Sequence, residues 1–259
     1  MKRIRRFIPV LLAIGVAASS GCVYWRLLQF KRQLDRFNEH FEFRSDSAYA
    51  LVAREPLLSH EDVDEIMEVE PTRREESGIL DWRVYAFTQV PDGRAPLVYR
   101  MGFRDGLLVE LHFPEQFTEL YPEAAIRELL ESLGRAKVER ETASTRSSLR
   151  RRLCEQLPDS TRVESALGPP SERDFDPALG ARRWLYRYRI LTSTTGKKEE
   201  KRRAWGCFWF GEGAELVRVD AGIGKHELRF DIPMEPEAAG DEAGKGRPIA
   251  RSRFDRRRK

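Results

Sequence analysis

The feature that most constrains the fold is an internal repetition within residues 55–113 and 155–221. Each stretch begins with a short segment of helical periodicity, LLSHEDVDEIMEVEP in the first and QLPDSTRVESALGPP in the second. Each then continues with runs in which apolar and polar residues alternate, LDWRVYAF and LVYRMGFRDGLLVELHF in the first, RRWLYRYRI and AWGCFWFGEGAELVRVDA in the second. Repetition on this scale indicates that one supersecondary unit occurs twice.

The alternating runs predict strands, because period-two alternation with aromatic and β-branched residues is typical of a half-buried sheet. Asp105-Gly106 and Glu212-Gly213 stand between such runs, and Asp-Gly in this position favours a hairpin. Ser59 and Ser160 precede the helical segments, where a hydroxyl side chain can cap a helix. The sequence therefore predicts an α+β fold of two repeated units, each of short helices plus an antiparallel β-meander, preceded by an N-terminal amphipathic helix.

That N-terminal helix is predicted from YWRLLQFKRQLDRFNEHF, residues 24–41. Its apolar residues recur at spacings of three and four, at Leu27, Phe30, Leu34, Phe37 and Phe41. Such a seam belongs to a helix with one buried face. Docking on the body of the protein is the simplest interpretation. Contact with a membrane or a partner helix stays open as an alternative, because basic residues lie beside the seam.

The first 21 residues have the three parts of a secretory signal: a basic start, an apolar run from Phe7 to Ala18, and small residues before Cys22. The segment SSGC resembles the lipobox of bacterial lipoproteins, in which the Cys is acylated and becomes the mature N-terminus. The alternative is an uncleaved membrane anchor, because the 19 residues from Phe7 to Trp25 carry no charge. Both readings place the body outside the cytoplasm.

For a lipoprotein of a Gram-negative cell, Val23 after the Cys implies the periplasmic face of the outer membrane. An uncleaved helix would instead anchor the chain in the inner membrane. The leader also accounts for the net charge of +4, since removing its four basic residues leaves 42 basic against 42 acidic ones. A neutral body offers no argument for nucleic-acid binding, which needs basic charge on the folded domain.

The other two cysteines, Cys154 and Cys207, form an even pair once Cys22 carries lipid. In an oxidising compartment they are candidates for a disulfide. Two buried thiols that act as small apolar side chains are the alternative.

The order of motifs in the repeats resembles the SmpA/OmlA or BamE-like repeat of small outer-membrane lipoproteins. It is carried by Ser160 with Val163, by Leu167-Gly168 at the helix end, by Trp184-Leu185-Tyr186, and by Phe210 with Gly213. The same α+β unit occurs twice in β-lactamase inhibitor proteins. The resemblance implies a noncatalytic envelope protein that binds other proteins through sheet or loop surfaces. The expected organisation is 1–21 lipoprotein signal peptide, 22–43 lipid anchor and amphipathic helix, 44–113 first BamE-like repeat, 114–147 linking helix, 148–233 second repeat, and 234–259 disordered basic tail.

We expect no catalytic residues, cofactor or metal site, because none of the common nucleophile, nucleotide or zinc motifs is present. The expected partners are the membrane, through the lipid, and envelope proteins whose identity the sequence does not give. The alternative function is a periplasmic carrier or sensor that binds an apolar ligand between sheet and helices. The candidate interaction residues are the strand aromatics Trp82, Tyr85, Trp184, Tyr186, Trp205 and Trp209.

The basic tail is a second candidate surface, for a polyanion such as anionic lipid. A solvated, disordered end is the alternative. The residues concerned are Arg251, Arg253, Arg256, Arg257, Arg258 and Lys259.

Overall fold

The structure, a computed structural model, describes residues 23–91, 95–139, 144–150, 156–190 and 203–233. A helix over residues 23–35 comes first. It is followed by α2 (Phe37–His40), α3 (His60–Met67), α4 (Gln116–Leu120), α5 (Glu123–Arg135) and α6 (Ser160–Leu167). None of the helices in these ranges is both long enough and apolar enough to cross a bilayer.

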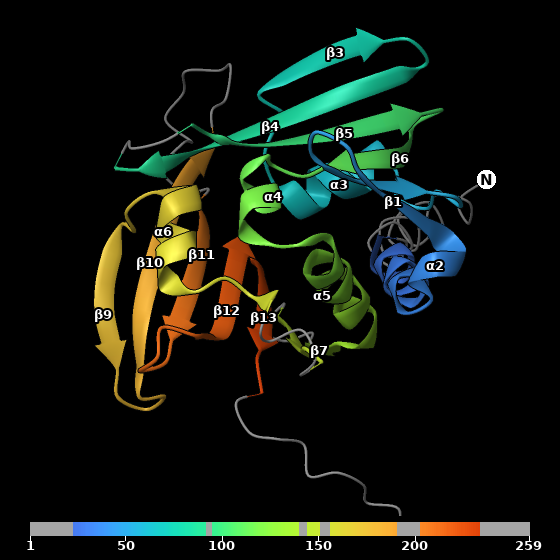
Figure 1. The fold of residues 1–259 in the computed structure, drawn as a ribbon. Helices are drawn as coiled ribbons and strands as arrows, with labels where there is room; N and C mark the ends of the chain where they lie inside the picture. Colours follow the sequence, from blue (N-terminus) through green and yellow to red (C-terminus); the bar gives the residue numbers. More distant parts are fainter. Residues whose placement is uncertain (1–22, 92–94, 140–143, 151–155, 191–202, 234–259) are drawn as a thin grey trace, which may run out of the picture.

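Strands make up most of the remaining structure (Figure 1). They are β1 (Phe41–Ser45), β2 (Tyr49–Ala53), β3 (Arg73–Ser77), β4 (Leu80–Val90), β5 (Leu97–Arg104), β6 (Leu107–His112), β7 (Lys137–Glu139), β8 (Ser144–Ser148), β9 (Glu172–Asp176), β10 (Ala181–Ile190), β11 (Arg203–Phe210), β12 (Leu216–Ile223) and β13 (His226–Asp231).

The described strands form one sheet of thirteen, in the order β1-β2-β6-β5-β4-β10-β11-β12-β13-β8-β7. Strand β3 pairs with the first half of β4, and β9 pairs with the first half of β10. The second halves of β4 and β10 pair with each other, from Arg187 opposite Val90 to Ile190 opposite Phe87. These neighbours are all antiparallel, except β13 and β8, which run parallel.

The predicted fold of two repeated helix-plus-meander units is therefore wrong. The two halves share one mixed sheet through the β4–β10 ladder, and the helices beside it are few and short. The sheet also contains strands that the alternation did not predict, among them β3, β7, β8 and β9. Their sequences, RREES, KVE, STRSS and ERDFD, are mostly polar and carry no apolar period.

Two predicted ranges also differ in detail. The seam residue Phe41 lies in strand β1, because the first helices end at His40. The range 114–147 is interrupted at Pro122 between α4 and α5 and then enters β7 and β8. Proline lacks the amide hydrogen that a helix interior needs, which explains the break.

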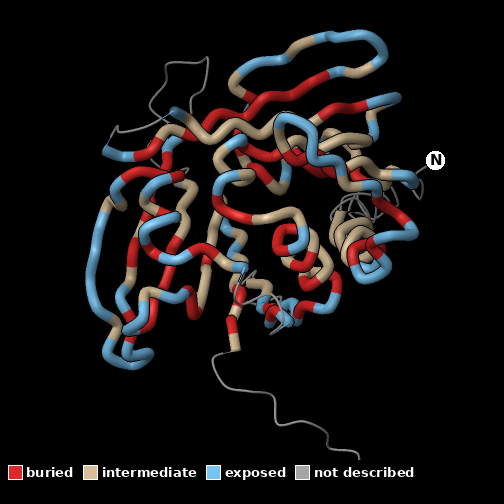
Figure 2. The backbone as a smooth tube through the Cα atoms, in the orientation of Figure 1, coloured by how far each residue is buried: buried red, intermediate tan, exposed pale blue. Residues whose placement is uncertain are grey.

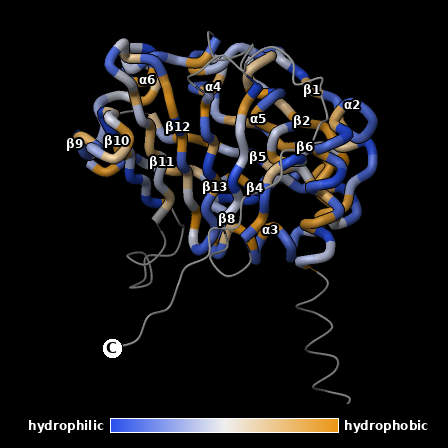
Figure 3. The backbone as a smooth tube through the Cα atoms, turned by 90° about the horizontal axis from the view of Figure 1, so that it is seen from below, coloured by the Kyte–Doolittle hydropathy of each residue, from blue (hydrophilic) through white to orange (hydrophobic). Residues whose placement is uncertain are grey.

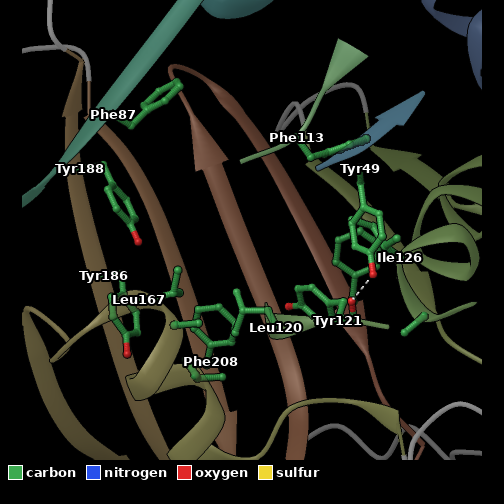
Figure 4. Packing of buried hydrophobic residues seen from close by; sticks show 14 of the residues in the cluster. Tyr49, Phe87, Phe113, Leu120, Tyr121, Ile126, Leu167, Tyr186, Tyr188 and Phe208 are labelled. Atoms are coloured by element: carbon green, nitrogen blue, oxygen red, sulfur yellow. Dashed lines mark hydrogen bonds between the residues drawn. The ribbon is translucent and has the colours of Figure 1, made fainter. Parts of the chain in front are cut away.

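Residues of the helices share one core with side chains from one face of the sheet, which we call the inner face. Figure 3 shows α4 and α6 together on one side of strands β10 to β12. Tyr186 of β10 donates a hydrogen bond to the carbonyl of Gly168 at the end of α6, at 3.0 Å. Arg83 of β4 reaches Asp64 of α3, with 2.7 Å between Nη1 and Oδ1. Figure 4 shows the resulting core, in which aromatic side chains from the strands meet aliphatic ones from the helices. Burial of these side chains supplies most of the drive to fold.

The ends of α3 and α6 follow from local chemistry. The Ser59 hydroxyl accepts a hydrogen bond from the Asp62 amide, and the Asp62 carboxylate accepts one from the Ser59 amide. This reciprocal arrangement is a capping box. Helix α6 is capped instead by Asp159, which accepts from the Arg162 amide at 2.8 Å. Thus Asp159, and not Ser160, occupies the cap position of α6.

The helix over residues 23–35 docks on the body, as the simplest interpretation of its seam predicted. Leu34 of this helix and Phe37 of α2 are buried in the main core. Lys31 donates to the carbonyl of Gly134 at 2.7 Å. Gly134 in α5 lies directly against the helix backbone, because a Cβ there would be 2.5 Å from the Cα of Asp35. The two helices therefore cross at a contact that only glycine permits.

Candidate interaction face

The outer face of the sheet carries a hollow over β10, β11 and β12. On this side Leu185 pairs with Cys207, and Cys207 with Asp220, so these alternate positions form a row across the three strands. The hollow has a volume of about 410 Å³. We call it the outer hollow, and its lining residues are Arg183, Leu185, Arg187, Ala204, Trp205, Cys207, Trp209 and Asp220. Helices α4 and α6 lie on the opposite, inner face of these three strands.

The floor of the outer hollow is apolar. Trp205, Cys207 and Trp209 project from β11 on the same side, because successive side chains of a strand alternate between faces. They form a second apolar cluster, separate from the main core, together with Leu185, Ala181 and Val217. Trp209 and Cys207 are buried, whereas Trp205 and Leu185 are half-buried. The hollow therefore offers partly accessible apolar surface beside a rigid ladder.

Trp205 lies flat on the neighbouring strand. A Cβ atom on Gly222, its partner residue in β12, would be 2.6 Å from Cε2 of the indole. The absence of a side chain at Gly222 thus leaves room for the ring to lie against β12.

Arginines surround this floor, and each is paired with a carboxylate. Arg218 lies over the Trp209 ring, with 4.4 Å from Cζ to the ring centroid, and also bonds Asp220. Asp220 is only 5% exposed and accepts further hydrogen bonds from Arg229, at 3.1 and 3.2 Å. The hydrogen bond from Arg218 to Asp220 raises the pKa of this guanidinium above its usual value. These pairs hold the arginines at fixed positions around the tryptophans.

The wall formed by β9 and β10 repeats this arrangement. Arg183 binds Asp174 through two parallel hydrogen bonds, with Nε to Oδ1 at 2.8 Å. Arg187 forms an ion pair with Glu172, the β9 residue opposite Leu185. Trp209 donates its indole N–H to Asp176 at 3.3 Å. Charges of both signs therefore line the hollow, and their pairing leaves no large local excess.

Cys207 is buried in the floor of the outer hollow and has no disulfide partner among the described residues. Burial raises its pKa to about 12, so it is protonated at neutral pH. A protonated thiol is a poor nucleophile. Within the described ranges, no group of three His, Cys, Asp or Glu side chains could hold a metal ion.

The predicted strand aromatics divide between the two faces. Trp205 and Trp209 lie together in the outer hollow. Tyr85, Trp184 and Tyr186 point into the inner core, and burial raises the pKa of Tyr85 to about 12. Their role is packing.

Trp82 lies outside the main core, under the guanidinium of Arg100, with 4.8 Å from Cζ to the ring centroid. It is 8% exposed and has an edge contact with His112. Its ring is therefore covered by its own neighbours.

Several predictions fall on residues outside the described ranges. These are the signal peptide, Cys22, Cys154 and the basic tail from Arg251 to Lys259. Acylation, the disulfide with Cys207 and the polyanion contact stay predictions.

The polar residues of the outer hollow were not predicted from the sequence. Arg183, Leu185 and Arg187 alternate with the core aromatics of β10, so the alternation itself carried the signal. Asp220 was also missed, although it is the one acidic residue within the apolar strand β12. What the sequence did not contain is the register that places these side chains beside Trp205 and Trp209.

Comparison with protein-family models, with curated proteins and with solved structures finds no match to this chain. The resemblance to BamE-like lipoproteins therefore gains no support from relatives.

Proposed function

We propose that this protein is a noncatalytic, lipid-anchored component of the cell envelope that acts as a protein-interaction or envelope-assembly module. In this proposal Cys22 carries the lipid, and the body faces the periplasm from the outer membrane. The outer hollow is the surface that contacts an envelope protein. An uncleaved N-terminal helix in the inner membrane is the alternative form of anchoring.

The observation that carries the proposal is the pair of tryptophans in the outer hollow, framed by arginines. Tryptophan and arginine are enriched among the residues that dominate binding energy at protein interfaces. Such residues contribute most to affinity when their positions are preformed, because less conformational entropy is then lost on binding. Here the β11 ladder places Trp205 and Trp209 on the same face, and ion pairs hold Arg183 and Arg218 beside them.

The alternative function, a carrier of an apolar ligand between sheet and helices, fits the packing less well. The layer between β10–β12 and helices α4 and α6 is filled by side chains such as Leu120, Tyr186 and Phe208 (Figure 4). Leu120 and Tyr186 are 1% and 0% exposed. A ligand there would have to displace well-packed side chains, which is costly in a dense interior.

Crosslinking in intact cells followed by mass spectrometry separates the two functions. An interaction module predicts one envelope protein that is recovered reproducibly with this chain. A carrier predicts a small apolar molecule that copurifies with the chain under native conditions. Recovery of the small molecule without a protein neighbour would reverse our preference.

The anchor has its own test. Cells fed a labelled fatty acid should incorporate label into the wild-type chain and lose it in Cys22→Ala. Label that persists in the variant would show that Cys22 is not the acylated residue.

A further inference from the structure

Three exposed apolar side chains gather at one end of the molecule. Trp25 is 53% exposed, Ile79 is 74% exposed and Leu107 is 37% exposed. Ile79 belongs to the β3–β4 turn, and Leu107 begins β6 directly after the β5–β6 turn. Because Asp81 pairs with Phe103, these two turns lie at the same end of the sheet (Figure 1).

Trp25 joins this end through the first helix. Its neighbour Arg26 forms an ion pair with Asp62 in the first turn of α3, with 2.6 Å from Nη2 to Oδ1. Ser59, which caps α3, forms a β-bridge with Leu107. The start of the described chain, the start of α3 and the β5–β6 turn are therefore in one neighbourhood.

The described chain leaves no spacer between this neighbourhood and the proposed anchor. Residue 23 is already helical, and Arg26 is bound to the body. Arg26 follows Cys22 by four residues, a length of chain that spans at most about 14 Å even when fully extended. A lipid at Cys22, or an apolar helix ending there, would hold this end of the body at the bilayer surface.

We propose that the end formed by Trp25, Ile79 and Leu107 lies against the membrane and inserts these side chains into the interfacial region of a lipid bilayer. Tryptophan favours this region because its ring is apolar and its N–H is polar. This inference rests on the proposed anchor. It adds a second membrane contact and fixes which end of the body faces the lipid.

The charges at this end of the molecule favour insertion of apolar side chains over electrostatic attraction to the membrane. Exposed acids are Glu61, Glu76, Asp81 and Asp105. Exposed Arg104 and Arg32 lie in the same region, the latter with its guanidinium 5.9 Å from the centroid of the Trp25 ring. Because acids are at least as numerous as bases, anionic lipid gains no advantage, and the contact should not weaken at high salt.

The hairpin β9–β10 provides a matched control. Its turn, like that of β3–β4, contains a glycine with positive φ, Gly180 at +60° against Gly78 at +64°. Leu179 beside Gly180 is 40% exposed, so it is an apolar turn residue like Ile79. Figure 1 shows this hairpin turn on the opposite side of the molecule from the β3–β4 turn.

The test uses the full chain, with Cys154→Ser, reconstituted in phosphatidylcholine vesicles. An environment-sensitive fluorophore is attached at Ile79→Cys, Leu107→Cys or Leu179→Cys, and the chain without a new cysteine gives the background labelling. We expect the first two probes to emit at shorter wavelength and to be quenched by nitroxide-labelled lipid, with little effect of salt. The probe at position 179 should show neither change.

Sedimentation of the same vesicles separates the two possible failures. If the chain stays with the vesicles but probes 79 and 107 behave like probe 179, the inference that this end faces the membrane is refuted, and the proposed anchor is not. If the chain does not stay with the vesicles, both the proposed anchor and the inference are refuted.

Discussion

Replacing Gly134 with alanine should destabilise the protein, although alanine is the better helix former. Gly134 lies in α5, where glycine costs about 1 kcal/mol relative to alanine. An added methyl would approach the backbone of the first helix, 2.6 Å from the carbonyl carbon of Leu34 and 2.5 Å from the Cα of Asp35. Backbone atoms cannot escape by changing rotamer, so the whole helix must shift.

The magnitude follows from two opposing effects. Overpacking of this kind costs about 3 kcal/mol at the upper end of its usual range. The gain in helix propensity offsets about 1 kcal/mol of that, which leaves a loss of about 2 kcal/mol. For a chain of this size the loss corresponds to a fall in Tm of about 4–8 °C. The shift should also weaken the hydrogen bond from Lys31 to the Gly134 carbonyl.

Thermal unfolding followed by circular dichroism measures this effect, and Gly206→Ala is the matched control. A Cβ at Gly206 in β11 would meet only Phe208, at 3.7 Å, which is ordinary van der Waals contact. That variant should unfold within about 2 °C of the wild type or slightly above it, since alanine restricts the unfolded chain. If Gly134→Ala were as stable as Gly206→Ala, the first helix would not be seated against α5.

Two further predictions concern buried groups. Burial raises the pKa of Cys207 from 9.0 to about 12, so under reducing conditions at pH 8 its thiol should resist iodoacetamide in the folded chain and react readily in urea. Because the thiol ionises more easily in the unfolded chain, the stability of the fold should fall as pH rises from 9 to 12. Fast labelling of Cys207 in the native chain would contradict its burial. Asp62→Ala should lower the free energy of unfolding, measured in urea, by about 2–3 kcal/mol, because it removes the fully buried carboxylate that pairs with Arg26. The control Glu39→Ala breaks only the exposed pair with Arg36 and should cost under about 1 kcal/mol. Equal losses in the two variants would refute the assigned role of Asp62.

The sequence predicted individual elements better than their assembly. Strands β4, β5, β10 and β11 alternate large apolar residues with other side chains, and the structure contains all of them. Helix α3 also forms where Ser59 begins a capping pattern. These signals are local, so a single sequence is enough to reveal them.

The assembly depends on contacts that have no local signal. The β4–β10 ladder, which merges the two halves, involves only the last four residues of each strand, from Phe87 and Arg187 onward. The parallel pair of β13 with β8 joins segments far apart in the chain, and STRSS in β8 has no apolar face. The prediction of two repeated units failed because it joined correct elements without these pairings.

Of the outer hollow, only Trp205 and Trp209 were predicted from the sequence as interaction residues, for a similar reason. In β11 both faces are apolar, with Phe208 and Phe210 on one and Trp205 and Trp209 on the other. Alternation reveals two faces but does not tell which one the helices cover. Only the structure places Phe208 in the main core and leaves the tryptophans in the outer hollow. Figure 2 shows strand β9 as exposed, whereas the strands beside it contain buried residues.

The most direct test of the central claim is site-specific photocrosslinking from the outer hollow in living cells. A photoreactive phenylalanine at Trp205 should form an adduct with a specific envelope protein. The same residue at Phe175, which is 61% exposed on β9 and paired with Arg182 on the opposite face, should not form it. An adduct from position 175 and none from position 205 would contradict the assignment of the outer hollow as the interaction surface.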